Sequence, residues 1–529
     1  MQTDFDVIVI GGGINGAGIA RDAALRGLRV LLLEKDDFGS GTSSWSSRLI
    51  HGGLRYLEYA EIALVYESLH DRRALFRTAE HLVKPLRLTI PIYTQSRRGP
   101  WLVKLGMLAY DLLSFGKSLP GHRMLNRRET LELFPALDAA GLRGSASYYD
   151  GQVEYAERLV IENVLSASTA GAVLHNHCTV TRVDVSGSKV GAVHWQNQLT
   201  GQEESAIAPV VVNATGPWVD SLLGRVDTDP IVRQMGGTKG SHLIMDRFDG
   251  APEQALYVEA RSDGRPFFVL PWNEQLLVGT TDIRDDSAPE DLVMSGNEID
   301  YLLAELNALF PAADVSRQQI RHTYSGLRPL PHKADGPTSA ITRSHIIRHH
   351  SDVARGLYSI IGGKLTTYRS LAEDCLKQIS RDFDWQLAAC QTRSEKLPGA
   401  VGFTAAREKT QRPWLRSETA AHLLRVYGSR ALDVIALADT NPEWRETICA
   451  WTGAIAAEVP FACRFEFARN LDDVINRRTM IGLGPDRGRA TVESVATLLA
   501  AEFDWNDQER VRAIDEFRAE TDRRFQVAA

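Results

Sequence analysis

The sequence predicts an α/β protein of several domains that ends in a helical domain. The chain opens with a strand–turn–helix–strand pattern, and strand-like and helical stretches continue to about residue 390. Beyond residue 400 helical periodicity dominates, as in the apolar positions Leu423, Val426 and Tyr427. Because 529 residues exceed what one ordinary core holds, two or three domains are expected.

The opening pattern predicts a Rossmann-like domain that binds an adenine dinucleotide. It contains a strand at 6–10, a G-x-G-x-x-G turn at Gly11, Gly13 and Gly16, a helix at 17–26, a strand at 29–33 and then Glu34. The glycines permit a tight turn, close approach of a pyrophosphate and close helix packing, and the helix N-terminus offers N–H groups to the phosphates. Glu34 sits where a carboxylate accepts hydrogen bonds from ribose hydroxyls, which argues against NADP. This stretch alone leaves both FAD and NAD open.

Composition, charge and cysteine spacing exclude several classes of protein and site. Apolar residues make up 44% and charged residues 24%, the balance of a soluble globular protein. The net charge of −7 gives no reason to expect nucleic acid as a partner. The five cysteines are far apart and form no C-x-x-C, so neither a metal site nor a disulfide framework is expected. The polar residues 1–6 do not form a signal peptide, so we expect a cytoplasmic protein.

Further motifs follow the opening pattern. They are T-S-S-W-S-S-R-L-I-H-G-G-L-R-Y-L at 42–57, V-N-A-T-G-P-W at 212–218, K-G-S-H at 239–242, G-T-T-D at 279–282, T-Y-S-G-L-R-P-L at 323–330, A-I-T-R at 340–343 and G-G-K-L-T-T-Y-R at 362–369. In type and order they resemble the aerobic, membrane-associated, FAD-dependent glycerol-3-phosphate dehydrogenases. The resemblance runs from about residue 4 to 372 and is weaker after residue 398.

The resemblance implies FAD as the cofactor, in a domain of the glutathione-reductase and D-amino-acid-oxidase type. It implies that sn-glycerol 3-phosphate is oxidised to dihydroxyacetone phosphate by hydride transfer from C2 to FAD N5, in glycerol and glycerophospholipid catabolism. Electrons would pass to a membrane quinone of the respiratory chain, from a protein held peripherally at the cytoplasmic face of the inner membrane. The oligomeric state stays open, with a homodimer as one option.

Three alternatives stay open beside this function. An oxidase would return the electrons to oxygen and form peroxide, and an amine or amino-acid oxidase of the same superfamily would bind a carboxylate in place of a phosphate. A non-catalytic flavin-binding protein would report redox state to a partner. The cations in the matched motifs argue against the last alternative, because a pure binder needs no phosphate clamp.

The motifs and the resemblance together predict which residues bind the cofactor. The Ser/Thr-rich run at 42–47 offers short hydroxyls to a pyrophosphate, and the glycine pairs at 52–53 and 362–363 let a flat ring approach the backbone. A helix beginning near Leu365 would stabilise the anionic reduced flavin. The predicted contacts are Gly11, Gly13, Asn15, Gly16, Glu34, Lys35, Thr42, Ser43, Ser44, Ser47, Leu49, His51, Gly52, Gly53, Ala214, Thr215, Gly216, Gly363, Lys364, Leu365 and Thr366.

A phosphorylated substrate needs fixed positive charge, and the family's motifs bring four cations together: Arg55, Arg328, Arg343 and Lys364. Tyr56 adds a hydroxyl donor, while Thr281 and its neighbour Asp282 contact the substrate or support an arginine. Arg328 and Lys364 are predicted to act in catalysis as well as in binding. A base with a pKa near neutrality is needed for the C2 hydroxyl proton; His242 is the first candidate and His51 the second.

An FAD-dependent oxidoreductase region is predicted for residues 1–390, with a discontinuous cofactor domain. The cofactor domain takes about residues 1–60, 150–220 and 323–385. A sheet-containing substrate domain takes about 61–149 and 221–322, with strands at 267–270 and 276–279. The C-terminal helical domain takes 400–529.

Two segments are candidates for contact with a membrane. Residues 101–115 are largely apolar but too short to span a bilayer, so they fit either an interfacial helix with basic flanks or a buried helix. The C-terminal domain carries a basic cluster that fits either a phospholipid or partner contact or solvated helix faces: Arg469, Arg477, Arg478, Arg487 and Arg489.

Overall fold

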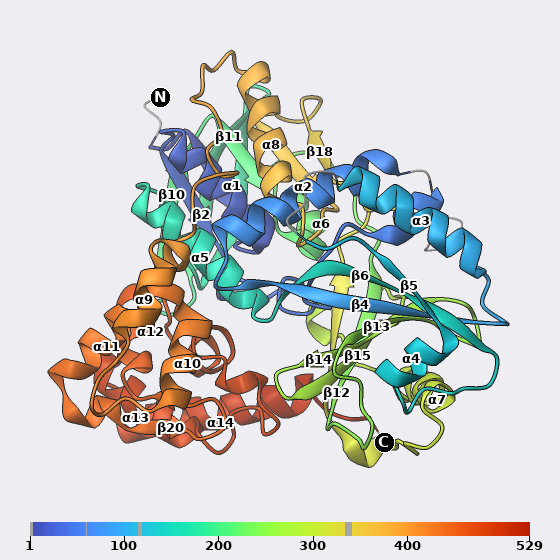
Figure 1. Cartoon of the computed structure of the whole chain (residues 1–529). Coiled ribbons are helices and arrows are strands. Elements are labelled where there is room, and N and C mark those ends of the chain that lie inside the picture. The colour runs from blue at the N-terminus through green and yellow to red at the C-terminus, as the bar shows by residue number, and fades with distance from the viewer. Residues whose placement is uncertain (1–3, 60, 115–118, 334–340, 529) are drawn as a thin grey trace.

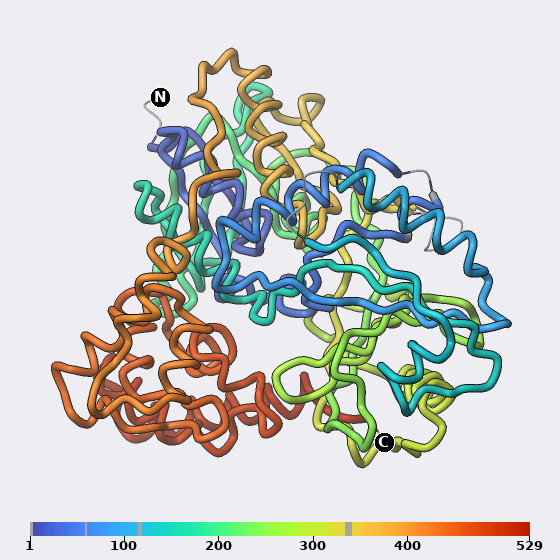
Figure 2. Tube along the Cα trace, in the orientation of Figure 1, coloured from blue at the N-terminus to red at the C-terminus, as the bar shows by residue number. Residues whose placement is uncertain are grey.

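The computed structural model describes residues 4–59, 61–114, 119–333 and 341–528, leaving aside the side chains of Arg55 and Tyr59. The chain forms an N-terminal α/β part at the top of Figure 1, a large sheet with covering helices at the lower right, and a helical C-terminal part at the lower left. The tube in Figure 2 shows that distant segments of the first 390 residues interleave, whereas the C-terminal part is continuous. The predicted fold class is confirmed.

The smaller sheet has the strand order β18-β19-β11-β1-β2-β7 and is parallel except for β18. Its strands are β1 (Val7–Ile10), β2 (Val30–Leu33), β7 (Val173–His175), β11 (Val210–Asn213), β18 (Ile346–His349) and β19 (Leu357–Ile361). One face packs against the helices α1 (Ile14–Leu25), α5 (Ala156–Thr169) and α8 (Tyr368–Asp382).

The opposite face packs against a small antiparallel sheet formed by β8 (Cys178–Ser186), β9 (Lys189–Asn197) and β10 (Glu203–Ile207). Val7 and Val9 point to the helices, and Ile8 and Ile10 point to this small sheet. Because both faces are covered, a parallel strand is apolar at every position, which explains the unbroken apolar run of β1.

The large sheet lies beside the smaller one. Its path is β16-β12-β15-β14-β13-β4-β6-β3, with β17 beside β12 and β5 beside β6. The strands are β3 (Leu49–Ile50), β4 (Val83–Tyr93), β5 (Arg123–Asn126), β6 (Leu142–Val153), β12 (Thr238–Met245), β13 (Ala255–Glu259), β14 (Pro266–Trp272), β15 (Gln275–Gly279), β16 (Ile283–Arg284) and β17 (Ile320–Arg328). The helices packed around it include α2 (Ile62–Thr78), α3 (Pro100–Leu113), α4 (Arg127–Leu133) and α7 (Gly296–Leu309).

One strand lies in a different sheet from the one the sequence indicates. Residues from 323 onward were expected in the cofactor domain, but β17 pairs antiparallel with β12 along its length, with Arg328 opposite Thr238 and Tyr324 opposite His242. The alternation of a strand predicts its faces and not its neighbour, so sequence alone does not assign it to a sheet.

The C-terminal part confirms the predicted helical domain and adds a short hairpin. Its helices are α9 (Phe403–Lys409), α10 (Ser417–Tyr427), α11 (Ala431–Thr440), α12 (Glu458–Phe465), α13 (Val492–Phe503) and α14 (Asp507–Arg524), and the hairpin is β20 (Thr447–Cys449) with β21 (Ala454–Ile455). The chain then returns to the large sheet, where the Thr323 hydroxyl donates to the Gln526 carbonyl at 2.7 Å. The predicted basic cluster does not form one exposed surface, because Arg477, Arg478 and Arg487 are buried and only Arg469 and Arg489 are exposed.

Helix α3 has one buried and one exposed apolar face. Val103, Met107 and Tyr110 are buried, so the alternative of a buried helix holds for one face only. The other face exposes large apolar side chains: Trp101, Leu102, Leu105, Leu108 and Leu112. Residue 115, the end of the predicted segment, lies outside the described residues. Among the described helices, none has both the length and the hydropathy needed to cross a membrane.

Candidate active site

A cavity of about 250 Å³ lies at the carboxyl ends of β1 and β11, beside the start of α1. Gly11 and Gly13 of the opening motif form one wall of this cavity. Gly11 has φ +107°, and a Cβ atom on Gly16 would lie 1.8 Å from the Gly11 carbonyl oxygen, so the helix packs directly on the turn. Around Gly13 a Cβ atom would meet only the Ser43 hydroxyl, at 3.4 Å, which leaves this face of the turn open to a ligand.

Glu34 closes this cavity at the end of β2. Its carboxylate accepts hydrogen bonds from the backbone N–H groups of Gly12, at 2.6 Å, and Asp36, at 2.9 Å. Burial raises the pKa of Glu34 to about 7, so a hydrogen-bonding ligand would meet a carboxyl group near its midpoint at neutral pH. Lys35 lines the same cavity, with its ammonium 4.6 Å from the centre of the Trp218 ring.

A second cavity of about 1050 Å³ adjoins the first, between the smaller and the large sheet. The two cavities share lining residues, so they form one long cleft. The shared residues are Thr42, Ser46, Pro329, Gly363, Lys364 and Leu365. Gly363 has φ +89°, which L side chains rarely adopt, and a Cβ atom there would lie 2.9 Å from the Leu371 side chain and 3.0 Å from the Asn15 amide nitrogen, so any other residue would be strained at this constriction.

Three of the predicted cations converge on the larger cavity. Arg328, Arg343 and Lys364 all line it. The Lys364 ammonium donates to the Ser68 hydroxyl at 2.6 Å and lies 4.6 Å from the centre of the Tyr56 ring. Burial lowers the pKa of Lys364 to about 8, although nearby carboxylates oppose the shift. The side chain of Arg55 lies outside the described part of the chain.

His242 lies in the wall of the larger cavity as a buried, neutral imidazole. Its Nε2 atom is 2.9 Å from the Ser47 hydroxyl, and its ring stacks on Tyr324 with centroids 4.8 Å apart. Burial, reinforced by Arg328 and Arg48, lowers the pKa of His242 to about 3. The expectation of a base with a near-neutral pKa is therefore wrong for His242 in this structure. Burial also lowers the pKa of the second candidate, His51, to about 4.

A buried network supports the His51-Gly52 turn from behind. The Gly52 N–H donates to the Tyr110 hydroxyl at 3.0 Å and to Asp150 at 3.2 Å. Tyr110 donates in turn to Asp150 at 2.8 Å, and Arg72 pairs with the same carboxylate. Since Tyr110 lies on the buried face of α3, this helix contributes directly to the frame of the site.

Known proteins with this arrangement are flavoenzymes. The family model described as FAD dependent oxidoreductase matches residues 6–369, and the model for the C-terminal domain of alpha-glycerophosphate oxidase matches residues 390–510. The chain belongs to the FAD-dependent oxidoreductase family, among the glycerol-3-phosphate dehydrogenases. A Synechocystis sp. glycerol-3-phosphate dehydrogenase is 45% identical, with 98% of this chain and 96% of the relative covered.

One further relative and one solved structure are also similar to this chain. A Brucella abortus D-erythritol 1-phosphate dehydrogenase is 36% identical, with 90% of this chain and 94% of the relative covered. The crystal structure of a glycerol-3-phosphate dehydrogenase from Bacillus halodurans complexed with FAD superposes with a TM-score of 0.80. It is 28% identical and covers 99% of this chain and 96% of its own. The cofactor of this family is FAD.

The cleft fits FAD as the sequence predicted. Its narrow part has the glycine turn and Glu34 for the ADP half, and its wide part has room for the isoalloxazine ring and a substrate. The buried Asn15 Oδ1 atom, at the constriction between them, has no hydrogen-bond partner within the described part of the chain. Predicted cofactor residues that line the cleft are Gly11, Gly13, Asn15, Glu34, Lys35, Thr42, Ser43, Ser47, Leu49, His51, Gly53, Ala214, Thr215, Gly216, Gly363, Lys364, Leu365 and Thr366.

Other predicted residues lie behind the cleft. The Ser44 hydroxyl donates to the Gly39 carbonyl at 2.7 Å, Gly16 packs on Gly11, and a Cβ atom on Gly52 would meet the Tyr110 hydroxyl at 2.4 Å. The Thr281 hydroxyl donates to Glu298 at 2.7 Å, and Thr280 lines the cavity in its place. The Thr281 carbonyl accepts from Arg328 at 2.9 Å, which agrees with the alternative that Thr281 supports an arginine.

The sequence also missed parts of the site that only the fold brings together. Asp150 lines the cavity from β6, where nothing in its local motif predicted a role. Additional arginines at the cavity lining, Arg97, Arg98, Arg265 and Arg284, come from separate loops and strands. Asp150 and these four arginines lie outside the matched motifs, so a prediction based on motifs does not include them.

Proposed function

We propose that the protein oxidises sn-glycerol 3-phosphate to dihydroxyacetone phosphate, with FAD as the hydride acceptor and a membrane quinone as the final oxidant. The convergence of Arg328, Arg343 and Lys364 on one cavity supports this proposal most directly. A phosphate monoester carries about two negative charges at neutral pH, and guanidinium groups match its oxygens with paired N–H donors.

Different residues of the cavity bind the substrate and accept the proton. Arg328, Arg343 and Lys364 hold the phosphate, and Tyr56 and Thr280 lie near enough to orient the glycerol hydroxyls. FAD, when bound, accepts the hydride that leaves C2. As the C2 carbonyl forms, the C2 hydroxyl must lose its proton to a group of the chain.

His242 is the proposed acceptor of that proton. Its imidazole is neutral, and its Nε2 atom already faces a hydroxyl, that of Ser47, at 2.9 Å. With a pKa of about 3, the His242 imidazole is a weak base and does not retain the proton. The proton must therefore pass on to solvent within the same turnover. His51, the second candidate, lines the same cavity.

Anaerobic bleaching of the flavin tests cofactor, substrate and reaction together. We expect sn-glycerol 3-phosphate to bleach the bound FAD at about 450 nm, with dihydroxyacetone phosphate formed in equal amount. D-erythritol 1-phosphate, the substrate class named for one relative, and glycine serve as comparison substrates. Faster bleaching by either would reassign the substrate, and no bleaching by any of the three would favour the non-catalytic alternative.

The final oxidant is tested separately. Stoichiometric peroxide release with oxygen, without reduction of a quinone analogue, would overturn the quinone assignment in favour of an oxidase. The exposed apolar face of α3 supports contact with the interfacial region of a membrane, next to the hydrocarbon region in which membrane quinones dissolve.

A further inference from the structure

The loop that follows β2, residues 36–44, separates the cofactor cleft from the C-terminal helical domain. On its inner side Asp36 and residues 40–43 line the narrow part of the cleft. The Ser43 hydroxyl accepts from the Ile14 N–H at 3.0 Å, and the Gly39 N–H donates to the Gly12 carbonyl at 3.0 Å. The shape of this loop is therefore also the shape of the ADP-binding wall.

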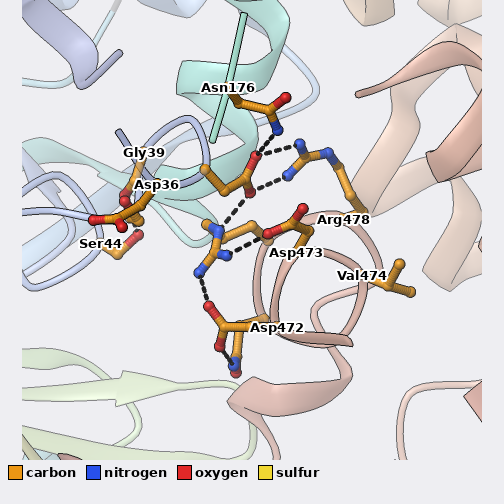
Figure 3. A network of polar contacts seen from close by, with 12 residues as sticks. Asp36, Gly39, Ser44, Asn176, Asp472, Asp473, Val474 and Arg478 are labelled. Carbon is orange, nitrogen blue, oxygen red and sulfur yellow. Dashed lines mark hydrogen bonds and ion pairs between the residues drawn. The ribbon is translucent and has the colours of Figure 1, made fainter. Parts of the chain in front are cut away.

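The outer side of the loop is held by two arginines of the C-terminal domain. Arg478 donates through both terminal nitrogens to the Asp37 carboxylate, at 2.8 Å each, and Arg477 donates to it at 2.5 Å. Asp37, Arg477 and Arg478 are all buried. In the sequence Asp37 lies 440 residues before Arg477 and 441 residues before Arg478. In Figure 3 this network lies between the loop that carries Asp36, Gly39 and Ser44 and the turn that carries Arg478 and Asp473.

Neighbouring contacts orient both partners of this network. Arg477 also pairs with Asp472 at 2.6 Å and with Asp473 at 2.9 Å, so its guanidinium is fixed from both sides. Asn176 bridges the parts, because its amide donates to Asp37 at 3.0 Å and to the Phe467 carbonyl at 2.9 Å. Asp37, His177 and Asp473 group like metal ligands, but both carboxylates already face arginines, which argues against a cation there.

Aromatic packing extends the contact to the glycine turn itself. The Phe38 ring is fully buried and meets the Phe467 ring edge-on, with centroids 5.8 Å apart. A Cβ atom on Gly12 would lie 2.5 Å from the Phe38 ring. One continuous line of contacts therefore runs from Phe467, in the C-terminal domain, through Phe38 to the dinucleotide turn.

We infer that Asp37, Arg477 and Arg478 are positioning residues, through which the C-terminal helical domain holds the 36–44 loop in the conformation that binds the ADP half of FAD. The loop has no strand or helix ladder of its own to order it. Ordering a loop costs backbone entropy, so a loop that the clamp orders in advance binds FAD more tightly. The domain thus contributes to cofactor retention without touching the cleft.

FAD release from the purified holoenzyme tests the inference. Arg478→Lys keeps the charge but loses the two-pronged contact with Asp37, while Arg477 still neutralises the carboxylate. On dilution, recovery of free-flavin fluorescence should show release about tenfold faster than in the wild type, within the range of coupled sites. The readout is independent of turnover.

Glu458→Gln is the matched control. It removes the charge of a buried carboxylate in the same domain, which accepts from the Tyr427 hydroxyl at 3.0 Å and from the Ile455 N–H at 2.9 Å and lies 3.0 Å from the His422 imidazole. We expect this control to lower the thermal midpoint but to leave the FAD release rate within about twofold of the wild type. Equal release rates for R478K and wild type, or equally fast release for R478K and E458Q, would overturn the inference.

If R478K fails to fold, hydrogen exchange of the wild-type chain tests the same inference. Coupling is reciprocal, so FAD must protect the C-terminal side of the clamp as much as the clamp retains FAD. Hydrogen exchange with and without FAD should show slower exchange at Asp473–Arg478 and no change at α11, in the same domain. Identical exchange at Asp473–Arg478 in the two states would reject the clamp.

Discussion

Asp282 places one carboxylate oxygen 3.0 Å from a terminal nitrogen of Arg328, and its other oxygen lies 3.5 Å from Arg343. Burial raises the pKa of Asp282, but Arg328 and Arg343 outweigh it and hold the pKa below its usual value. A single ionised carboxylate thus keeps two guanidinium groups side by side at the cavity wall. Arg328 also donates to the Thr280 hydroxyl and to the Thr281 carbonyl, each at 2.9 Å, so the orientation of its guanidinium is set before any substrate arrives.

This arrangement predicts that Arg328→Ala weakens substrate binding and spares FAD. Removing one partner of a partly buried, charge-assisted contact should raise KM for glycerol 3-phosphate about 100-fold. Flavin content, measured as the ratio of absorbance at 450 and 280 nm, should match the wild type. Arg321→Ala removes an arginine from an exposed pair with Asp246 and should leave both values unchanged. Loss of FAD from the Arg328 variant would show that Arg328 supports the cofactor instead.

The lowered pKa of Lys364 predicts a decrease of kcat/KM at alkaline pH. Its pKa is lowered to about 8, so the ammonium is charged below pH 8 and loses its proton above it. Because kcat/KM reports the free enzyme, it should be flat up to about pH 8 and then fall about tenfold per pH unit.

Lys364→Arg separates this charge from other titrations. An arginine stays protonated over the whole range, so the plateau of kcat/KM should extend beyond pH 9 even if its height falls. An unchanged limb near pH 8 in that variant would assign the titration to another group.

The proposed role of His242 as proton acceptor predicts that its substitution lowers kcat and leaves KM nearly unchanged. His242→Asn keeps a polar side chain of similar reach but removes the proton acceptor, and should lower kcat about 100-fold with KM within a factor of three. Ser47→Ala keeps the imidazole and removes its hydrogen bond, so a smaller loss is expected. Since the pKa of His242 is about 3, no histidine limb from it should appear between pH 5 and 8. Wild-type kcat in His242→Asn would leave His51 as the candidate base.

The geometry of the glycine turn could be predicted from the sequence, because it depends on residues within one motif. Gly11 and Gly16 shape the turn as their spacing predicted, since each role depends on neighbours within a few residues. The supports were not predictable in the same way. Asp37 and Arg477 lie 440 positions apart, and an arginine cluster in a helical domain looks the same in sequence whether it is solvated or buried.

Thr280 and Thr281 show a second limit, which is the direction of individual side chains. The sequence names Thr281 as a residue that contacts the substrate or supports an arginine, and its carbonyl accepts from Arg328 at 2.9 Å while its hydroxyl donates to Glu298. Thr280, which follows the end of β15, lines the cavity. Both residues belong to the same matched motif, and the motif alone does not say which hydroxyl faces the cavity.

Helix α3 predicts how the protein meets a membrane. Trp101 is 81% and Leu112 is 75% exposed, while Tyr110 on the opposite face is held by Asp150 inside the molecule. Each Leu that enters the interfacial region contributes about 1.5–3 kcal/mol of apolar burial. The double variant Leu105→Glu, Leu112→Glu should therefore bind vesicles of anionic phospholipid about 100-fold more weakly, as measured by co-sedimentation.

The matched control places the same charge on an exposed apolar position elsewhere. Val511 on α14 is 50% exposed, and Val511→Glu should bind vesicles as the wild type does. All three proteins should reduce a soluble dye at the same rate, because α3 contacts the site only through its buried face. Wild-type vesicle binding by the double variant would exclude α3 as the membrane contact, and a wild type that stays in the supernatant at low salt would exclude membrane binding through this helix altogether.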